Sequence, residues 1–73
     1  MEAMMTPWEK VRTDVESRLK DEFVDQPVTI DAIRRMTDRA HVLLKEQGWG
    51  GLTIAFDEEY LRMGEIRIGK VSG

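Results

Sequence analysis

Residues 48–56 read Gly48-Trp49-Gly50-Gly51-Leu52-Thr53-Ile54-Ala55-Phe56, and this stretch decides the fold. Before it, apolar residues recur every three or four positions, as they do on one face of a helix. After the glycines they alternate, as they do on one face of a strand. The change of period predicts a junction between helix and strand, and Gly48 suits the left-handed residue that commonly follows a helix.

Two amphipathic helices are predicted before this junction. The first spans about residues 6–24, where Thr6 and Glu9 have the spacing of a capping box. The second spans about residues 29–47, with Thr29 as its N-cap. A short connection makes the two helices antiparallel neighbours. The predicted core between the helices and the hairpin contains Trp8, Val11, Val15, Leu19, Phe23, Ile33, Met36, Ala40, Leu43 and Leu44.

The helical wheels also predict which side chains of the two helices face the core and which face solvent. Ile30 falls on the apolar side of the second helix, whereas Val42 breaks the pattern and is expected to point outward. On the first helix, Glu16 is expected to pair with Lys20, four positions later, on the outer face, and Asp14 pairs with Arg18 in the same way.

Residues 51–71 predict a β-hairpin. Its first strand places Leu52, Ile54 and Phe56 on one face, and its second strand is expected at residues 65–68. Val71 returns to the apolar face only if Gly69 forms a bulge. The connection, residues 57–64, fits either a short helical turn or an extension of both strands. The predicted fold is therefore a single α+β domain over residues 1–73, in the order α-α-β-β.

Composition excludes several classes of protein. The chain has 73 residues, no cysteine and one histidine, so we expect no disulfide and no dedicated zinc site. Its net charge of −3 argues against a protein that binds the nucleic-acid backbone. No apolar run approaches the roughly 18 residues of a membrane span, and the first residues carry no basic leader region, so we expect synthesis in the cytoplasm.

The residues offer no recognisable catalytic chemistry, and we expect no enzyme activity, cofactor or metal. His41 stands alone as a candidate base and is interpreted as structural. The acidic group Asp57, Glu58, Glu59 and Glu65 matches no calcium-binding pattern and is interpreted as a solvated loop. The basic group Arg34, Arg35 and Arg39 has acidic neighbours within one helical turn and is interpreted as a solvated face.

The hairpin carries the main clue to function. A lone two-stranded ribbon has unpaired backbone groups along both edges, and two helices cover only one of its faces. The edges are therefore open to a strand from another protein, unless Glu65, Arg67 and Lys70 simply keep a short edge solvated. Both interpretations stay open at this point.

Five residues are candidate contacts for a protein partner. Trp49 is either an exposed aromatic anchor or folds back onto the core, which is the commoner arrangement. The others lie in the hairpin connection, where they have no evident contact within the chain, or on the second strand. The candidates are Trp49, Tyr60, Leu61, Met63 and Arg67.

Residues 29–71 resemble the helix-plus-hairpin segments of small phage tail, baseplate and other virion structural proteins. The resemblance rests on an amphipathic helix, a glycine turn, the strand that ends in Phe56-Asp57, a polar loop and Gly64-Glu65-Ile66-Arg67-Ile68. It implies a non-enzymatic assembly role, in which strands add to the sheets of neighbouring subunits, and a place in the virion.

Two functions follow from these observations. The first is a structural or assembly protein that acts through protein–protein contacts, by self-association or within a larger assembly. The alternative is a small acidic regulatory binder or inhibitor of another protein. The two differ in stoichiometry, because an assembly subunit self-associates whereas an inhibitor forms a defined complex with one target.

Overall fold

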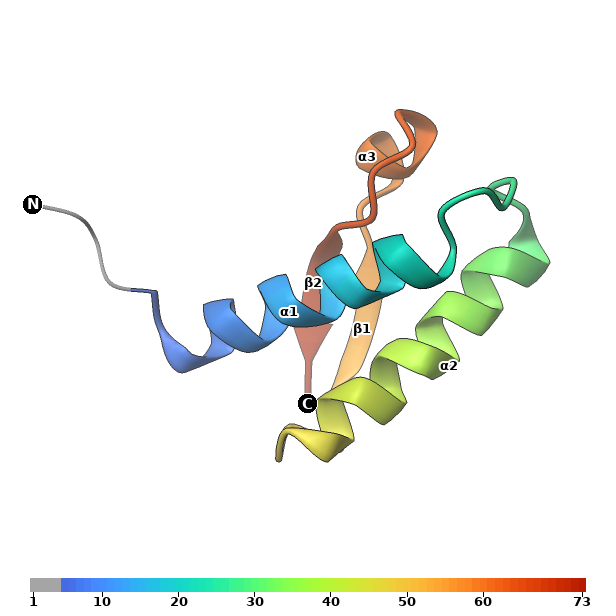
Figure 1. Cartoon of the computed structure of the whole chain (residues 1–73). Coiled ribbons are helices and arrows are strands. Elements are labelled where there is room, and N and C mark those ends of the chain that lie inside the picture. Colours follow the sequence, from blue (N-terminus) through green and yellow to red (C-terminus); the bar gives the residue numbers. More distant parts are fainter. Residues whose placement is uncertain (1–4) are drawn as a thin grey trace, which may run out of the picture.

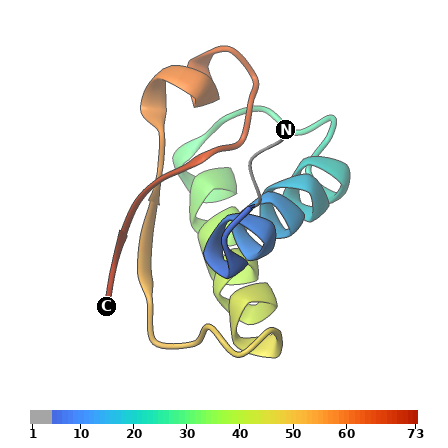
Figure 2. The same ribbon diagram turned by 90° about the vertical axis from the view of Figure 1, so that its left-hand side faces the viewer.

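The computed structural model describes residues 5–73, and the first four residues of the expected 1–73 domain lie outside the described residues. Two long helices, α1 (Pro7–Glu22) and α2 (Ile30–Glu46), precede a hairpin of β1 (Thr53–Phe56) and β2 (Ile68–Ser72), with α3 (Glu58–Arg62) in its connection. The helices run in opposite directions and cross obliquely in front of the hairpin (Figure 1). Figure 2 shows the two layers, with helices against one face of the hairpin only. The predicted α-α-β-β order is confirmed.

Both long helices begin where their caps predict. The Thr6 hydroxyl accepts the Glu9 backbone N–H at 3.1 Å, and the Glu9 carboxylate accepts the Thr6 N–H at 3.1 Å, which completes the capping box. At the start of α2, the Thr29 hydroxyl accepts the Ala32 N–H at 3.1 Å. These side chains satisfy backbone donors that lack a partner in the first turn.

The capping box makes the stability of α1 sensitive to acid. The hydrogen bond from the Thr6 backbone N–H, followed by that from the Thr6 side chain, holds the pKa of Glu9 below its ordinary value of 4.5. Because the folded-state pKa is the lower one, the contribution of the Glu9 carboxylate is present above pH 4.5 and is lost as the pH falls through the folded pKa.

We therefore expect Glu9→Gln to flatten the pH dependence of the melting temperature below about pH 5. Glu65→Gln, which removes a carboxylate outside this cap, is the matched control and should leave that acid limb steep. Thermal melts at a series of pH values measure the effect. An equally steep acid limb in the Glu9 variant and the wild type contradicts this account.

The end of α2 forms the expected glycine cap. Gly48 has φ of 84°, its N–H donates to the Lys45 carbonyl at 3.1 Å, and the Trp49 N–H donates to the Leu44 carbonyl at 2.8 Å. This is the Schellman arrangement, which satisfies two carbonyls at the helix end and turns the chain toward β1.

Replacing Gly48 with alanine should cost about 1–2 kcal/mol, because an L-residue disfavours positive φ. No atom lies within 4 Å of the added Cβ, so the loss comes from the backbone alone. Gly50→Ala is the matched control: its Cβ makes ordinary contact with Lys45 at 3.4 Å, and φ there is not in the left-handed region. Urea unfolding of both variants should separate them. Equal midpoints for the two variants contradict the cap argument.

The core lies between the helices and the hairpin. Val15, Leu19, Met36, Ala40, Leu43 and Leu44 are buried as predicted, and Trp8, Val11, Phe23 and Ile33 are partly buried against them. The prediction that Ile30 lies on the buried side of α2 is wrong, since its side chain is 82% exposed. It is the first residue of α2, and helical side chains lean toward the N-terminus, so Ile30 extends beyond the region that α1 covers. Val42 points outward, as expected.

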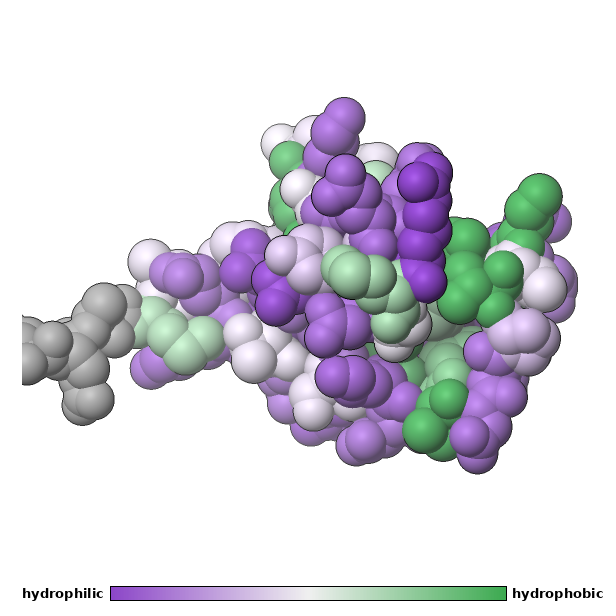
Figure 3. Space-filling model, turned by 90° about the horizontal axis from the view of Figure 1, so that it is seen from above, coloured by the Kyte–Doolittle hydropathy of each residue, from purple (hydrophilic) through white to green (hydrophobic). Residues whose placement is uncertain are grey.

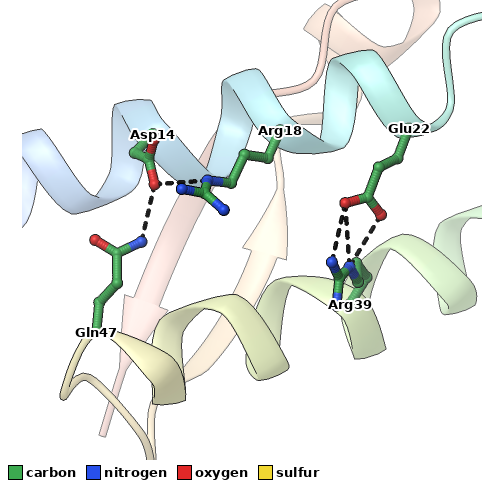
Figure 4. Close-up of polar contacts among 5 residues, drawn as sticks. All are labelled: Asp14, Arg18, Glu22, Arg39 and Gln47. Carbon is green, nitrogen blue, oxygen red and sulfur yellow. Dashed lines mark hydrogen bonds and ion pairs between the residues drawn. The ribbon is translucent and has the colours of Figure 1, made fainter.

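Polar contacts on the solvent side join the two long helices (Figure 4). Arg39 of α2 makes a two-pronged ion pair with Glu22 near the end of α1, with distances of 2.9 Å and 3.1 Å. This contact raises the pKa of Arg39, chiefly through the hydrogen bond to Glu22. Near the other end of α2, Gln47 donates to Asp14 at 3.0 Å, and Asp14 also pairs with Arg18 as predicted.

The second strand differs from the prediction. It begins at Ile68 rather than at residue 65, because residues 65–67 return the chain from α3. The Glu65 N–H donates to the Tyr60 carbonyl at 2.8 Å, and the Arg67 carbonyl accepts the Asp57 N–H at 2.8 Å. The connection thus contains a short helix, one of the two alternatives left open by the sequence.

A bulge is present at Gly69, which is the condition under which Val71 was expected to return to the apolar face. Phe56 pairs with Ile68 and Ala55 with Lys70, so Gly69 has no opposite residue. A Cβ at Gly69 would lie 3.1 Å from the Cβ of Asp57, which explains the glycine. The bulge places Val71 opposite Ile54, where it is 40% exposed at the open end of the hairpin.

Candidate functional site

A polar cleft of about 420 Å³ lies between α1 and the segment that runs from the end of β1 to the start of β2. It brings together residues far apart in the sequence, including two of the five predicted contact residues. Its lining consists of Arg12, Thr13, Glu16, Asp57, Tyr60, Arg67 and Ile68.

Asp57 and Gly64 position the α3 side of this cleft. The Asp57 carboxylate caps α3 by accepting the N–H of Glu59 at 3.0 Å and that of Tyr60 at 3.4 Å. At the other end of α3, Gly64 has φ of 82° and forms a second Schellman turn, in which the Glu65 N–H reaches the Tyr60 carbonyl. The turn brings Arg67 back to Tyr60, and the Arg67 guanidinium lies 4.2 Å from the centre of the Tyr60 ring.

Glu16 positions the α1 side. Its carboxylate accepts the backbone N–H of Ile68 at 2.7 Å, which joins α1 to the first residue of β2 across 52 positions of sequence. The predicted pairing of Glu16 with Lys20 is therefore wrong in this structure, since no ion pair forms between them. The Glu16 carboxylate instead accepts the Ile68 N–H at the sheet edge, because that backbone donor otherwise lacks a partner.

Arg12 is the residue of the cleft that sequence reasoning missed most completely. Its Nε atom is buried and has no hydrogen-bond partner. Arg12 stands one helical turn before Glu16, on the flank of the apolar stripe of α1. A position beside the apolar stripe indicates partial burial. The sequence around Arg12, however, carries no information that residues 57–68 pack over this part of α1.

Four of the five predicted contact residues separate into three groups. Tyr60 and Arg67 lie together in the cleft, and Met63 is 67% exposed at the end of α3. The prediction that Leu61 contacts a protein partner and lacks a contact within the chain is wrong. Leu61 is 6% exposed and belongs to the core. The helical connection turns Leu61 inward, which an extended hairpin would not do.

Trp49 folds back onto the core. It is partly buried, and its ring centre lies 5.4 Å from that of Trp8 at a tilt of 50°. The Schellman turn sets this direction, because its second residue commonly packs against the preceding helical turn. The structure thus follows the commoner of the two arrangements considered for Trp49.

An exposed apolar surface lies where α1 and α2 join. Val24 is 72% exposed, Val28 51% and Ile30 82%. Seen from above in Figure 3, apolar side chains gather on the side of the molecule that holds this helical connection. We call these three residues the loop patch. Large apolar side chains left exposed on one side of a molecule are typical of contact surfaces.

The interpretation of the acidic loop changes in one respect. Asp57 is the N-cap of α3, so it has a structural role rather than being only part of a solvated loop. Glu58 and Glu59 lie in the first turn of α3, where their negative charges interact favourably with the helix dipole. Within residues 5–73, no group of three or more His, Cys, Asp or Glu residues is placed to hold a metal ion. His41 is partly buried, with a buried Nε2 that has no hydrogen-bond partner.

The fold defines a small α+β domain in which two crossed helices cover one face of a two-stranded sheet. Comparison with known proteins found no family model, curated protein or solved structure that matches this chain. None of the helices in the described part of the chain is long and apolar enough to cross a membrane.

Proposed function

We propose that this protein is a non-enzymatic assembly module that pairs the outer edge of β1 with a strand of another protein chain, in the first instance a second copy of itself. The observation that carries the proposal is the two-stranded sheet, which has no third strand within residues 5–73. Such a ribbon leaves a row of backbone donors and acceptors on each edge, and these are the groups used in strand addition.

The geometry favours β1 over β2 as the pairing edge. On β2, the Ile68 N–H is already bonded to Glu16, and the bulge at Gly69 interrupts the ladder. Bulges twist an edge away from further pairing. β1 has no such interruption of its own, and its Thr53 and Ala55 side chains are exposed on the open face of the sheet.

The register predicts which amides receive the added strand. Because the Ile68 N–H points to Glu16 and so away from β1, its pair with Phe56 is of the non-hydrogen-bonded kind. The Phe56 N–H therefore faces the outer edge. In an antiparallel ladder the two kinds of pair alternate, so the Ile54 N–H faces outward as well.

The loop patch and Met63 support an assembly role, since both present apolar side chains to a partner. The resemblance to phage tail and baseplate proteins implies the same role, and it implies that the assembly belongs to a virion. The alternative, a small acidic regulatory binder, uses the same surfaces but requires a single defined target.

The test introduces lysine at the β1 edge. Ala55→Lys adds a charge beside the outer edge, a device that natural sheets use against edge pairing. Ser72→Lys places the same charge on β2 and is the matched control. Light scattering over a wide concentration range should show self-association of the wild type and of the Ser72 variant, and a monomer for the Ala55 variant.

Hydrogen exchange makes the test specific for the edge. The Ile54 and Phe56 amides should exchange quickly in the monomer and slowly in the assembled protein. A wild type that stays monomeric at every concentration contradicts the proposal. A monomer that binds one target in a one-to-one complex would instead favour the regulatory binder.

A further inference from the structure

The cleft between α1 and residues 57–68 holds two guanidinium groups that form no ion pair with the carboxylates of its lining. Outside that lining, Glu9 lies one helical turn before Arg12, and its pKa is lowered chiefly by the hydrogen bonds from Thr6 and in smaller part by the charge of Arg12. The buried Nε of Arg12 has no hydrogen-bond acceptor. Arg67 lies over the face of the Tyr60 ring, which orients its guanidinium without neutralising it. In the part of the chain that the structure describes, no ion pair within 4.0 Å involves either arginine.

The carboxylates of the cleft are already engaged. Glu16 accepts the Ile68 N–H, and Asp57 accepts two N–H groups at the start of α3. Both acids therefore serve the backbone, and the positively charged donors of the cleft, those of Arg12 and Arg67, have no hydrogen-bonded acceptor within the described residues. A buried donor without an acceptor is costly, so a ligand that supplies an acceptor to Arg12 gains that energy on binding.

We infer that this cleft binds one carboxylate group of another protein chain, either an acidic side chain or a C-terminus. A carboxylate is planar, carries one charge and matches the fork of donors on a guanidinium. Glu16 and Asp57 disfavour a phosphate monoester, which carries about −1.5 to −2 charges and is repelled by both acids more strongly than a carboxylate is. The inference is independent of pairing at β1, because the cleft opens beside the start of β2.

The test is an NMR titration of the full chain with four small probes. Acetyl-alanyl-alanine offers a C-terminal carboxylate, and acetyl-glutamate amide offers a side-chain carboxylate. Acetyl-glutamine amide is the neutral control, and inorganic phosphate tests the competing anion. We expect saturable shifts of the Arg12 Nε–H, the Tyr60 ring and the Ile68 amide with one or both carboxylate probes. The neutral probe should cause none, and phosphate should bind more weakly. The stronger of the two carboxylate probes identifies the source of the group.

Substitutions locate the binding energy. Arg12→Gln and Arg67→Gln should each weaken carboxylate binding about tenfold or more, as expected for a lost charge-assisted hydrogen bond. Arg12→Lys and Arg67→Lys retain the charge but lose the planar fork, so they should bind with intermediate affinity and provide a second readout if a glutamine variant is unstable. Arg18→Gln is the matched control, because Arg18 lies on the same helix but pairs with Asp14 outside the cleft.

Any of the following results overturns the inference. One is the absence of saturable shifts in the cleft with both carboxylate probes. Another is equal binding of the glutamine probe, or tighter binding of phosphate. The last is a folded Arg12 or Arg67 variant, glutamine or lysine, that binds the carboxylate as well as the Arg18 control.

Discussion

Leu44→Ala is expected to unfold most of the protein at room temperature. The Leu44 side chain is fully buried at the centre of the core, between the helices and the hairpin. Truncation of a buried leucine costs about 2–5 kcal/mol, and a single core of this size supplies only about 3–5 kcal/mol of net stability. Circular dichroism in a urea titration should show a midpoint near zero denaturant.

Val42→Ala is the matched control for this experiment. It lies two positions earlier on α2 and is 46% exposed. Surface substitutions of this kind usually change stability by no more than about 0.5 kcal/mol. If the Leu44 and Val42 variants unfold at the same urea concentration, the core described here is wrong.

Glu16→Ala should remove the polar link between α1 and the hairpin. The variant leaves the Ile68 N–H without its acceptor at 2.7 Å, in a partly buried position. Hydrogen bonds to charged groups contribute about 1.5–3 kcal/mol, and partial access of water to the site places the expected loss near the lower end of that range. Faster hydrogen exchange of the Ile68 amide should accompany the loss of stability.

Two further variants separate the hydrogen bond from other effects. Glu16→Gln retains an oxygen acceptor at the same position and should lose less stability than Glu16→Ala. Ser17→Ala changes the exposed neighbouring residue of α1 and should be close to neutral. Unchanged exchange at Ile68 in Glu16→Ala would show that Glu16 does not support the start of β2.

The features predicted correctly depend on residues near one another in the sequence. The capping box at Thr6, the N-cap at Thr29 and the left-handed turn at Gly48 each involve only a few consecutive residues. Their geometry follows from local hydrogen bonds and from the conformational freedom of glycine. The apolar period of each helix likewise identified the buried face without reference to the rest of the chain.

The errors have a different origin. Ile30 satisfied the helical period but lies at an end of α2 that nothing covers, and Leu61 entered the core because residues 57–64 fold as a helix. The start of β2 moved to Ile68 because the preceding residues close the turn after α3. In each case the periodicity describes which side chains share a face, but burial also requires a neighbouring element to cover that face.

The sequence by itself determined the order of the elements, the starts of the two long helices and most of the core. Only the tertiary structure decided the cleft, because Arg12 and Glu16 come from α1 whereas Tyr60 and Arg67 come from a segment more than 40 residues later. Local rules place each of these side chains on its own element. Their approach depends on the way α1 crosses the hairpin, which is set by packing of the whole core and by the bond from Ile68 to Glu16.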